Sequence, residues 1–330
     1  MSLLNVHGEW VNTDKPGGRV FFVGGGTVAY RGKAASDANS GLSPEQPLST
    51  ATQAHTQCVA GRGDTIVILP GTVTVTTPFA ITKSHVTLRG YTEVPPHIKP
   101  PCAIATSTDS VSMIESDANY VTIEYLYIDH NTTTADVQIL DIGDTSGCEG
   151  VLIRNCWFDL LDSATDTDGI RFGDGSRAVY RSVIEGCTFQ DYDQDAIVIS
   201  NNSDENVIRN CWFWDEDNTG RYAVELTGDN CLLEGNKIQT KGTAGFYING
   251  IKSITADNRI WGFGADTIGI LAAASKTFTS LNDHIACVAA GNMIDFTTSA
   301  TSPSSTTSVG NVTNTNPATP ALITATVGGS

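Results

Sequence analysis

An eight-residue pattern of apolar and polar positions recurs in the middle of the chain. In segments 151–158, 182–189 and 206–213, an apolar pair precedes a two-residue polar step, a cysteine and, two positions later, phenylalanine. The cysteines are 31 and then 24 residues apart, which lies within the roughly 20 to 50 residues typical of solenoid and propeller repeats. The chain therefore contains an internal repeat whose connecting turns vary in length.

The same frame continues downstream with asparagine in place of cysteine. Segments 231–238, 253–260 and 287–294 carry Asn236, Asn258 and Asn292 at that position, and a fainter copy surrounds Asn311. Stacked amides can hydrogen-bond along the axis of a repeat protein, so we expect a structural column of asparagines.

The cysteines of the first three copies, Cys156, Cys187 and Cys211, occupy equivalent positions without the Cys-x-x-Cys spacing of a metal site. We expect them to form an inward column of free thiols that pack as small hydrophobic side chains.

A second strand with strict alternation lies between the copies. It recurs at 168–172, 195–199, 222–226, 245–248 and 268–271, with turns rich in glycine, asparagine and aspartate. A solenoid coil supplies the crossover that parallel strands need, because each turn passes once round the axis. The pattern predicts an all-β, right-handed parallel β-helix with at least two strands per repeat. Propeller blades of about 40 to 50 residues with four antiparallel strands are too long for these repeats.

The rest of the chain divides by composition. Ser49 or Thr50 can cap a short helix in which Ala51, Ala54, Cys58 and Val59 share one face, and such a helix would cover the open first coil. The residues after 296 carry no charge and cannot build a core of their own. The predicted segments are an N-terminal arm (1–45), a capping helix segment (46–62), the parallel β-helix (63–296) and an uncharged Ser/Thr-rich C-terminal tail (297–330).

The repeats resemble the pectate-lyase-like parallel β-helix superfamily. Segments 35–47 and 63–71 resemble the lead-in and cap that its members carry, and similar chains occur among tailed-phage virion proteins. The resemblance implies the fold. It leaves the function open, because this superfamily includes lyases, hydrolases, adhesins and inert spikes.

Charge and hydropathy exclude several partners. The 330 residues carry a formal net charge of -17, with a pI of about 4.5, whereas nucleic acids and anionic lipids are bound by basic surfaces. No run of 18 apolar residues and no signal-peptide pattern occurs. We therefore expect no nucleic-acid partner, no membrane span, and synthesis in a host cytoplasm without a signal peptide.

Acidic turns supply the candidate catalytic residues. The segment from Asp159 to Asp217 contains fourteen carboxylates but only four arginines. Asp168 and Asp195 precede equivalent strands, so they would lie roughly 5 Å apart, near the carboxylate separation of retaining glycosidases. The surrounding residues resemble the aspartate motifs of polygalacturonases, which implies Asp168, Asp193 and Asp195 as catalytic candidates. Gln194 interrupts that motif, and the expected downstream histidine and basic clamp are missing.

Two other interpretations of these acids remain open. Aspartate before glycine or alanine commonly caps backbone N–H groups at a bend. Stacked carboxylates could instead bind calcium, the one cofactor that we consider. The candidate calcium ligands are Asp191, Asp193, Asp215 and Asp217.

Tryptophans mark a second candidate surface. Trp157 and Trp212 occupy the outward position of the repeat, and Trp214 follows nearby. Such side chains could stack on sugar rings or anchor a subunit interface, and the interface is the preferred interpretation.

Together these features predict a non-catalytic bacteriophage virion structural protein, a capsid decoration or spike on the virion surface. We expect a homotrimer whose tail makes intersubunit contacts, with capsid or tail proteins as partners and a host surface glycan as a further candidate. The alternative function is a polysaccharide-degrading enzyme, a glycoside hydrolase or lyase of the tailspike depolymerase type, that uses the acidic turn face.

Overall fold

The structure is a computed structural model that describes most of the chain between residues 3 and 322. For residues before 17 and after 286 the description covers the backbone alone. The segments within 3–322 that lie outside the described residues are 7–8, 13–16, 26–33, 107–111, 131–137, 161–167, 193, 216–219, 263–266, 274–277, 288–293, 297–306, 310–311 and 315–320.

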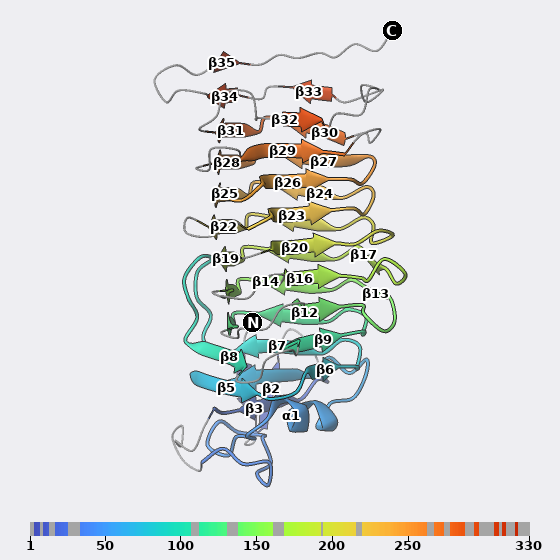
Figure 1. The fold of residues 1–330 in the computed structure, drawn as a ribbon. Coiled ribbons are helices and arrows are strands. Elements are labelled where there is room, and N and C mark those ends of the chain that lie inside the picture. The colour runs from blue at the N-terminus through green and yellow to red at the C-terminus, as the bar shows by residue number, and fades with distance from the viewer. Residues whose placement is uncertain are drawn as a thin grey trace.

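Three long sheets run along the molecule, and the coils from β4 to β32 each contribute one strand to each sheet (Figure 1). Sheet I has 11 strands: β3 (Val20–Val23), β4 (Thr65–Ile68), β7 (Thr87–Gly90), β10 (Thr122–Glu124), β14 (Leu152–Arg154), β18 (Val183–Glu185), β21 (Val207–Arg209), β24 (Leu232–Glu234), β27 (Ser253–Ala256), β30 (Phe278–Leu281) and β33 (Thr307–Val309). Sheet II has 11 strands: β5 (Gly71–Val75), β8 (Cys102–Thr106), β11 (Tyr127–Asp129), β15 (Trp157–Asp159), β19 (Thr188–Gln190), β22 (Trp212–Asp215), β25 (Lys237–Thr240), β28 (Arg259–Gly262), β31 (His284–Cys287), β34 (Val312–Asn314) and β35 (Ala321–Leu322). Sheet III has nine strands: β6 (Phe79–Ile81), β9 (Ile114–Ser116), β12 (Gln138–Ile142), β16 (Asp168–Phe172), β20 (Asp195–Ile199), β23 (Tyr222–Leu226), β26 (Ala244–Ile248), β29 (Ile268–Ala272) and β32 (Ile294–Phe296).

Strand pairing within these sheets is parallel except between β34 and β35. Two short sheets complete the structure: an antiparallel pair of β1 (Leu3–Val6) with β2 (Glu9–Asn12), and a parallel pair of β13 (Cys148–Glu149) with β17 (Val179–Tyr180). The predicted all-β parallel β-helix is confirmed. Within sheets I and II, β33 and β34 continue the parallel stacking into the segment predicted as a tail.

Each repeat phrase is two strands joined by a sharp bend, and so a coil has three strands. The residue before the cysteine or asparagine has a positive φ, with 53° at Asn155, 61° at Gly186 and 53° at Asn210. Glycine and asparagine tolerate this left-handed conformation better than other residues. The polar step of the phrase therefore turns the chain from sheet I into sheet II.

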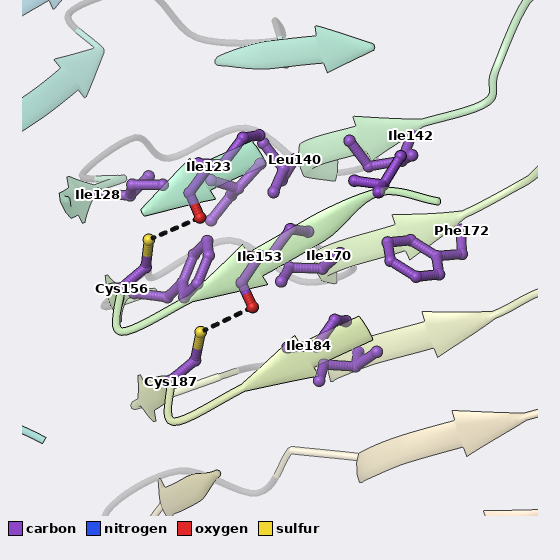
Figure 2. Close-up of a cluster of buried hydrophobic side chains, with 14 of the residues drawn as sticks. Ile123, Ile128, Leu140, Ile142, Ile153, Cys156, Ile170, Phe172, Ile184 and Cys187 are labelled. Carbon is purple, nitrogen blue, oxygen red and sulfur yellow. Dashed lines mark hydrogen bonds between the residues drawn. The ribbon is translucent and has the colours of Figure 1, made fainter. Parts of the chain in front are cut away.

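The cysteine column lies inside the β-helix, as predicted. Cys156, Cys187 and Cys211 are buried free thiols. Their Sγ atoms lie 3.8, 3.9 and 3.8 Å from the carbonyl oxygens of Ile123, Ile153 and Ile184 in the preceding coil, and Figure 2 shows the first two of these hydrogen bonds. In the other direction the Leu126 N–H donates to the sulfur of Cys156. The Cys156 thiol thus serves as both donor and acceptor between coils.

Asparagine performs the same task in later coils. The Asn236 amide donates to the carbonyl of Ile208 at 3.1 Å, and its Oδ1 accepts from the Cys211 N–H at 3.0 Å. Asn258 continues the column by accepting from the Asn236 N–H at 2.9 Å. The change from cysteine to asparagine therefore preserves the hydrogen bonds that join the coils.

The next position of the column corrects the predicted repeat. Strands β30 and β31 pair with β27 and β28, and Asp283 accepts from the Asn258 N–H at 2.9 Å. The sixth copy is therefore 278–285 rather than 287–294, because β32 belongs to sheet III. Asn292 and Asn311 themselves lie outside the described residues.

The single helix of the described chain, α1 (Ala51–Gln57), lies against the first coils, as predicted for a cap (Figure 1). The Thr50 hydroxyl accepts from the Gln53 N–H at 3.1 Å and caps its start. Ala51 and Ala54 are buried, but Val59 lies beyond the helix and is 49% exposed, so it does not share the predicted face. No helix among the described residues is long and apolar enough to cross a membrane.

Aromatic stacking follows from the register of the repeats. Phe158, Phe189 and Phe213 pair directly in sheet II, with ring centroids 4.8 and 5.0 Å apart and nearly parallel planes. All three are fully buried. The repeat thus places one large side chain at the same core position in three consecutive coils.

The thiols should react only when the protein unfolds. Seven cysteines are buried and unpaired, and burial raises the pKa of Cys156 and Cys187 well above the usual thiol range. Alkylation of the native protein should therefore leave these seven unmodified, whereas denaturation without reductant should allow all eight cysteines of the sequence to react. Intact-mass and peptide spectra measure both outcomes, and rapid native labelling of Cys187 would contradict the inward register.

Candidate functional site

Asp168 and Asp195 lie at equivalent positions of neighbouring strands in sheet III. Each begins its strand, and the register pairs Ile170 of β16 with Ile197 of β20. Asp195 in turn pairs with Tyr222 of β23. The structure therefore brings two of the three predicted catalytic residues together, and Asp193 lies outside the described residues.

Both carboxylates bond to the backbone of the next coil. Asp168 accepts from the N–H of Asp195, and Asp195 Oδ1 accepts from the N–H of Tyr222 at 3.0 Å. Asp195 is fully buried, whereas Asp168 is partly buried and its Oδ1 has no hydrogen-bond partner within the described part of the chain. These contacts match the predicted turn chemistry, in which aspartate satisfies backbone donors at a bend.

Arg221 is the basic partner of this site. Its Nε lies 3.3 Å from Asp195 Oδ1, and its Nη2 is ion-paired with both Asp195 and Glu225. The guanidinium lies 5.0 Å from the centroid of the Tyr222 ring, which stacks on Tyr247 with centroids 4.9 Å apart. Acidic, basic and aromatic groups therefore meet on the outer face of sheet III.

Sequence reasoning did not find Arg221 or Glu225. The signal for them was positional, because Arg221 immediately precedes the residue that pairs with Asp195 and Glu225 lies on the same strand. The recurrence of 195–199 at 222–226 already gives this register, so the signal for both residues was present in the sequence.

Burial sets the protonation of the two aspartates. It raises the pKa of Asp168 to about 6, although Arg221 and the Asp195 N–H favour the charged form. Burial also raises the pKa of Asp195, and repulsion from Asp168 acts in the same direction against the ion pair with Arg221. Both carboxyls of this site therefore bind a proton more readily than an exposed aspartate does.

The Asp168→Asn protein should be the more stable one at high pH. Because the folded pKa of about 6 exceeds the ordinary 3.8, ionisation of Asp168 opposes folding, with a cost that appears between pH 4 and 6 and persists above. Asparagine stays neutral and keeps an acceptor. We expect equal stability at pH 4 and a gain of up to about 3 kcal/mol at pH 8.

Thermal unfolding at the two pH values measures this difference. Asp174→Asn is the control with the opposite sign, because hydrogen bonds from Ser176 and Arg177 lower the pKa of Asp174. Relative to the wild type, the Asp174→Asn variant should become less stable as the pH rises from the acid range. A loss at pH 8 in Asp168→Asn would mean that the folded protein favours the charged form.

The predicted calcium ligands lie in different surroundings. Asp215 is fully buried and its Oδ2 accepts from the Thr240 hydroxyl at 3.2 Å, whereas Asp191 is partly buried and accepts from the Gln190 amide at 2.9 Å. Asp193 and Asp217 lie outside the described residues. Among the residues that are described, no three histidine, cysteine, aspartate or glutamate side chains are arranged to hold a metal ion.

The tryptophans lie on the outer face of sheet II. Trp157 and Trp212 flank Thr188 in register, and Trp212 stacks on Trp214 with centroids 5.7 Å apart. All three rings are partly buried. They therefore form a surface that is less open than the sequence pattern indicates.

A loop from an early coil lies across this face. Residues 91–101, which we call the strap, leave β7 and run along sheet II before β8 (Figure 1). The His97 ring meets Trp212 edge-on at 5.9 Å, and its Nδ1 lies 3.0 Å from the Thr188 hydroxyl. Lys99 Nζ lies 3.6 Å from the centroid of the Tyr127 ring. The strap thus covers part of the aromatic surface.

Comparison with known proteins finds solved structures with a similar fold and no match by sequence. No family model matches the chain, and no curated protein matches its sequence. Among solved structures, the chain is similar to ORF18 of Geobacillus virus E2, with 14% identity, a TM-score of 0.45 and coverage of 79% of this chain and 56% of that protein. An alginate lyase from Paenibacillus sp. str. FPU-7 gives 16% identity, a TM-score of 0.46 and coverage of 74% and 94%. A rhamnogalacturonan lyase gives 15% identity, a TM-score of 0.46 and coverage of 87% and 86%. The chain thus spans little more than half of the viral protein, and at this level of similarity none of the three assigns an activity.

Proposed function

We propose that this chain is a non-catalytic structural protein of a bacteriophage particle, which displays the β-helix on the particle surface as a capsid decoration or spike. The observation that carries the non-catalytic part is the state of Asp195. This carboxylate is fully buried, and both of its oxygens are already bonded, to Arg221 and to the Tyr222 N–H. A residue held in this way stabilises the turn and cannot also reach a substrate.

The virion part rests on the sequence. The repeats and the lead-in resemble those of tailed-phage virion proteins. Strands β33, β34 and β35 of the uncharged Ser/Thr-rich segment pair within the chain, and β35 is the edge strand of sheet II to which another subunit could add a strand. We propose a homotrimer as the assembled form, with capsid or tail proteins as its partners. Three long sheets of stacked coils would supply a rigid body for display.

Analysis of particles tests this proposal. Peptide mass spectrometry of phage particles purified from a strain that carries this gene should detect the chain at a fixed ratio to the major capsid or tail protein. Antibody-gold labelling should then mark the outside of intact particles. Absence of the chain from gradient-purified infectious particles would overturn the virion role.

A polysaccharide-degrading enzyme is the second candidate function. The specific observation in its favour is Asp168, whose pKa is raised to about 6 and whose Oδ1 has no partner among the described residues. A carboxyl that is protonated near neutral pH can act as a general acid. Its neighbours Glu225 and the Tyr222–Tyr247 stack could contact a sugar chain.

Activity assays separate the two functions. Under the structural proposal, the purified protein releases no reducing ends or unsaturated products from acidic and neutral polysaccharides. Activity that disappears in Asp168→Asn, while thermal unfolding shows a folded protein, would overturn the non-catalytic role.

A further inference from the structure

A column of basic side chains lies on the outer face of sheet II, toward the C-terminal end. The register pairs Lys237 of β25 with Arg259 of β28, and Arg259 with His284 of β31. All three side chains are exposed. In a chain with a net charge of -17, three consecutive coils thus present basic residues at the same position.

In sheet I, by contrast, acidic and basic side chains alternate along a column of paired positions. There Glu124 pairs in register with Arg89 and Arg154, with ion pairs of 3.3 and 2.6 Å. Glu185 and Arg209 continue the alternation with an ion pair of 2.6 Å. Like charges on directly paired strands repel, and in the part of the chain that the structure describes, neither Lys237 nor Arg259 forms an ion pair with a carboxylate. Repulsion within the basic column therefore raises the free energy of the folded protein, and a bound anion would remove this repulsion.

Tryptophans lie directly beside the basic column. Trp212 precedes Lys237 in register, and the neighbouring outward column contains Trp214, Gln239 and Trp261. The Trp212 Nε1 donates to Gln239 Oε1 at 3.2 Å, so this side chain orients the indole. Trp214 and Trp261 are partly buried and two strands apart, which places them roughly 10 Å from each other along the axis.

We propose that this face, from β22 to β31, binds an anionic polysaccharide. Sugar rings would stack on Trp214 and Trp261, as amphipathic rings do on aromatic faces. Carboxylates or sulfates of the polysaccharide would pair with Lys237 and Arg259. The guanidinium of Arg259 favours bidentate anion binding. The inference rests on the proposed display role, to which it adds the chemical class of a surface ligand.

Charge density favours a polysaccharide over a nucleic acid. Duplex DNA carries about one negative charge per 1.7 Å, whereas an anionic glycan carries about one per sugar. The short column of Lys237, Arg259 and His284 is spaced by one strand, and the remainder of the chain is strongly acidic. A ligand of moderate charge density fits this balance better.

Binding to the full-length protein tests the ligand class. Isothermal titration with polygalacturonate, dextran sulfate, uncharged dextran and a single-stranded oligonucleotide should give saturable, salt-sensitive binding of one or both anionic glycans only. Preference for the first indicates carboxylate recognition, and preference for the second indicates sulfate recognition. Failure of both, or equal or tighter binding of dextran or the oligonucleotide, would overturn the proposal.

Paired variants locate the site. The double variant Lys237→Gln, Arg259→Gln should weaken binding about tenfold or more, and Trp261→Ala should weaken it while Trp261→Phe retains most of it. Lys252→Gln is a control for the loss of a single positive charge outside this face, because Lys252 is exposed at the bend before β27, and it should leave binding nearly unchanged. Thermal unfolding of each variant verifies its fold.

The possible failures are distinguishable. Unchanged binding in the double variant overturns this site. If light scattering shows that the double variant dissociates an oligomer, then a second copy of the chain occupies the face and the glycan proposal is wrong. Neither result depends on whether the chain is found in phage particles, which is the measurement that decides the display role.

Discussion

Replacing Glu124 with alanine should cost about 3 to 5 kcal/mol of the free energy of unfolding. Glu124 and Arg89 are each only 3% exposed at the side chain, and Glu124 also holds Arg154 at 2.6 Å. Without Glu124, the buried guanidinium of Arg89 loses a buried counter-ion and retains the half-exposed Glu93 at 3.0 Å. The loss is large because the desolvated charge of Arg89 remains inside.

Glu185→Ala is the matched control in the same column of sheet I. Glu185 pairs with Arg209 at 2.6 Å, but the two side chains are 26% and 44% exposed. An ion pair that reaches solvent contributes about 0 to 1 kcal/mol. Urea unfolding monitored by circular dichroism compares the variants, and equal losses at the two positions would show that burial does not control the strength of this ladder.

The architecture was predictable because the repeat carries it directly. Segments 151–158, 182–189 and 206–213 place the same residue types in register, and the structure stacks them in that register. The number of strands per coil was not predictable from alternation alone. A single left-handed residue such as Asn155 divides the phrase into two strands, and its polar character resembles that of any exposed strand position.

Chemical equivalence explains the misplaced copy. The column position requires a side chain that bonds the backbone of the preceding coil, and cysteine, asparagine and aspartate all satisfy this requirement. A search for asparagine therefore selected Asn292, although Asp283 occupies the position. The fold preserves the hydrogen bond rather than the residue type.

The same register also predicted the pair of aspartates in the candidate site. The stacking of Asp168 on Asp195 was predictable, because both begin equivalent strands. The strap was not, because His97 meets Thr188 across 91 residues of sequence and no repeat records that contact. Contacts made by loops between distant coils depend on loop geometry, which the periodic pattern does not contain.

Asn258→Ala should be comparably destabilising, at about 3 to 5 kcal/mol. The Asn258 side chain is fully buried and makes four hydrogen bonds. Its Oδ1 accepts from the N–H and the Nδ2 of Asn236 at 2.9 and 3.0 Å, and its Nδ2 donates to Leu233 O and Asp283 Oδ1 at 2.9 Å each. Alanine would leave these buried groups without a partner between two coils.

Asn258→Cys separates loss of volume from loss of hydrogen bonds. In the earlier coils the thiol of Cys211 bonds to the Ile184 carbonyl, and the sulfur of Cys156 accepts the Leu126 N–H. A cysteine at position 258 can restore the equivalent bonds to Leu233 and to the Asn236 backbone, although it cannot replace the amide contact with Asp283. We expect it to cost about half as much as alanine. Urea unfolding of both variants decides the point, because equal losses would mean that cysteine and asparagine are not interchangeable in the column and that the repeat tolerates each only in its own coils.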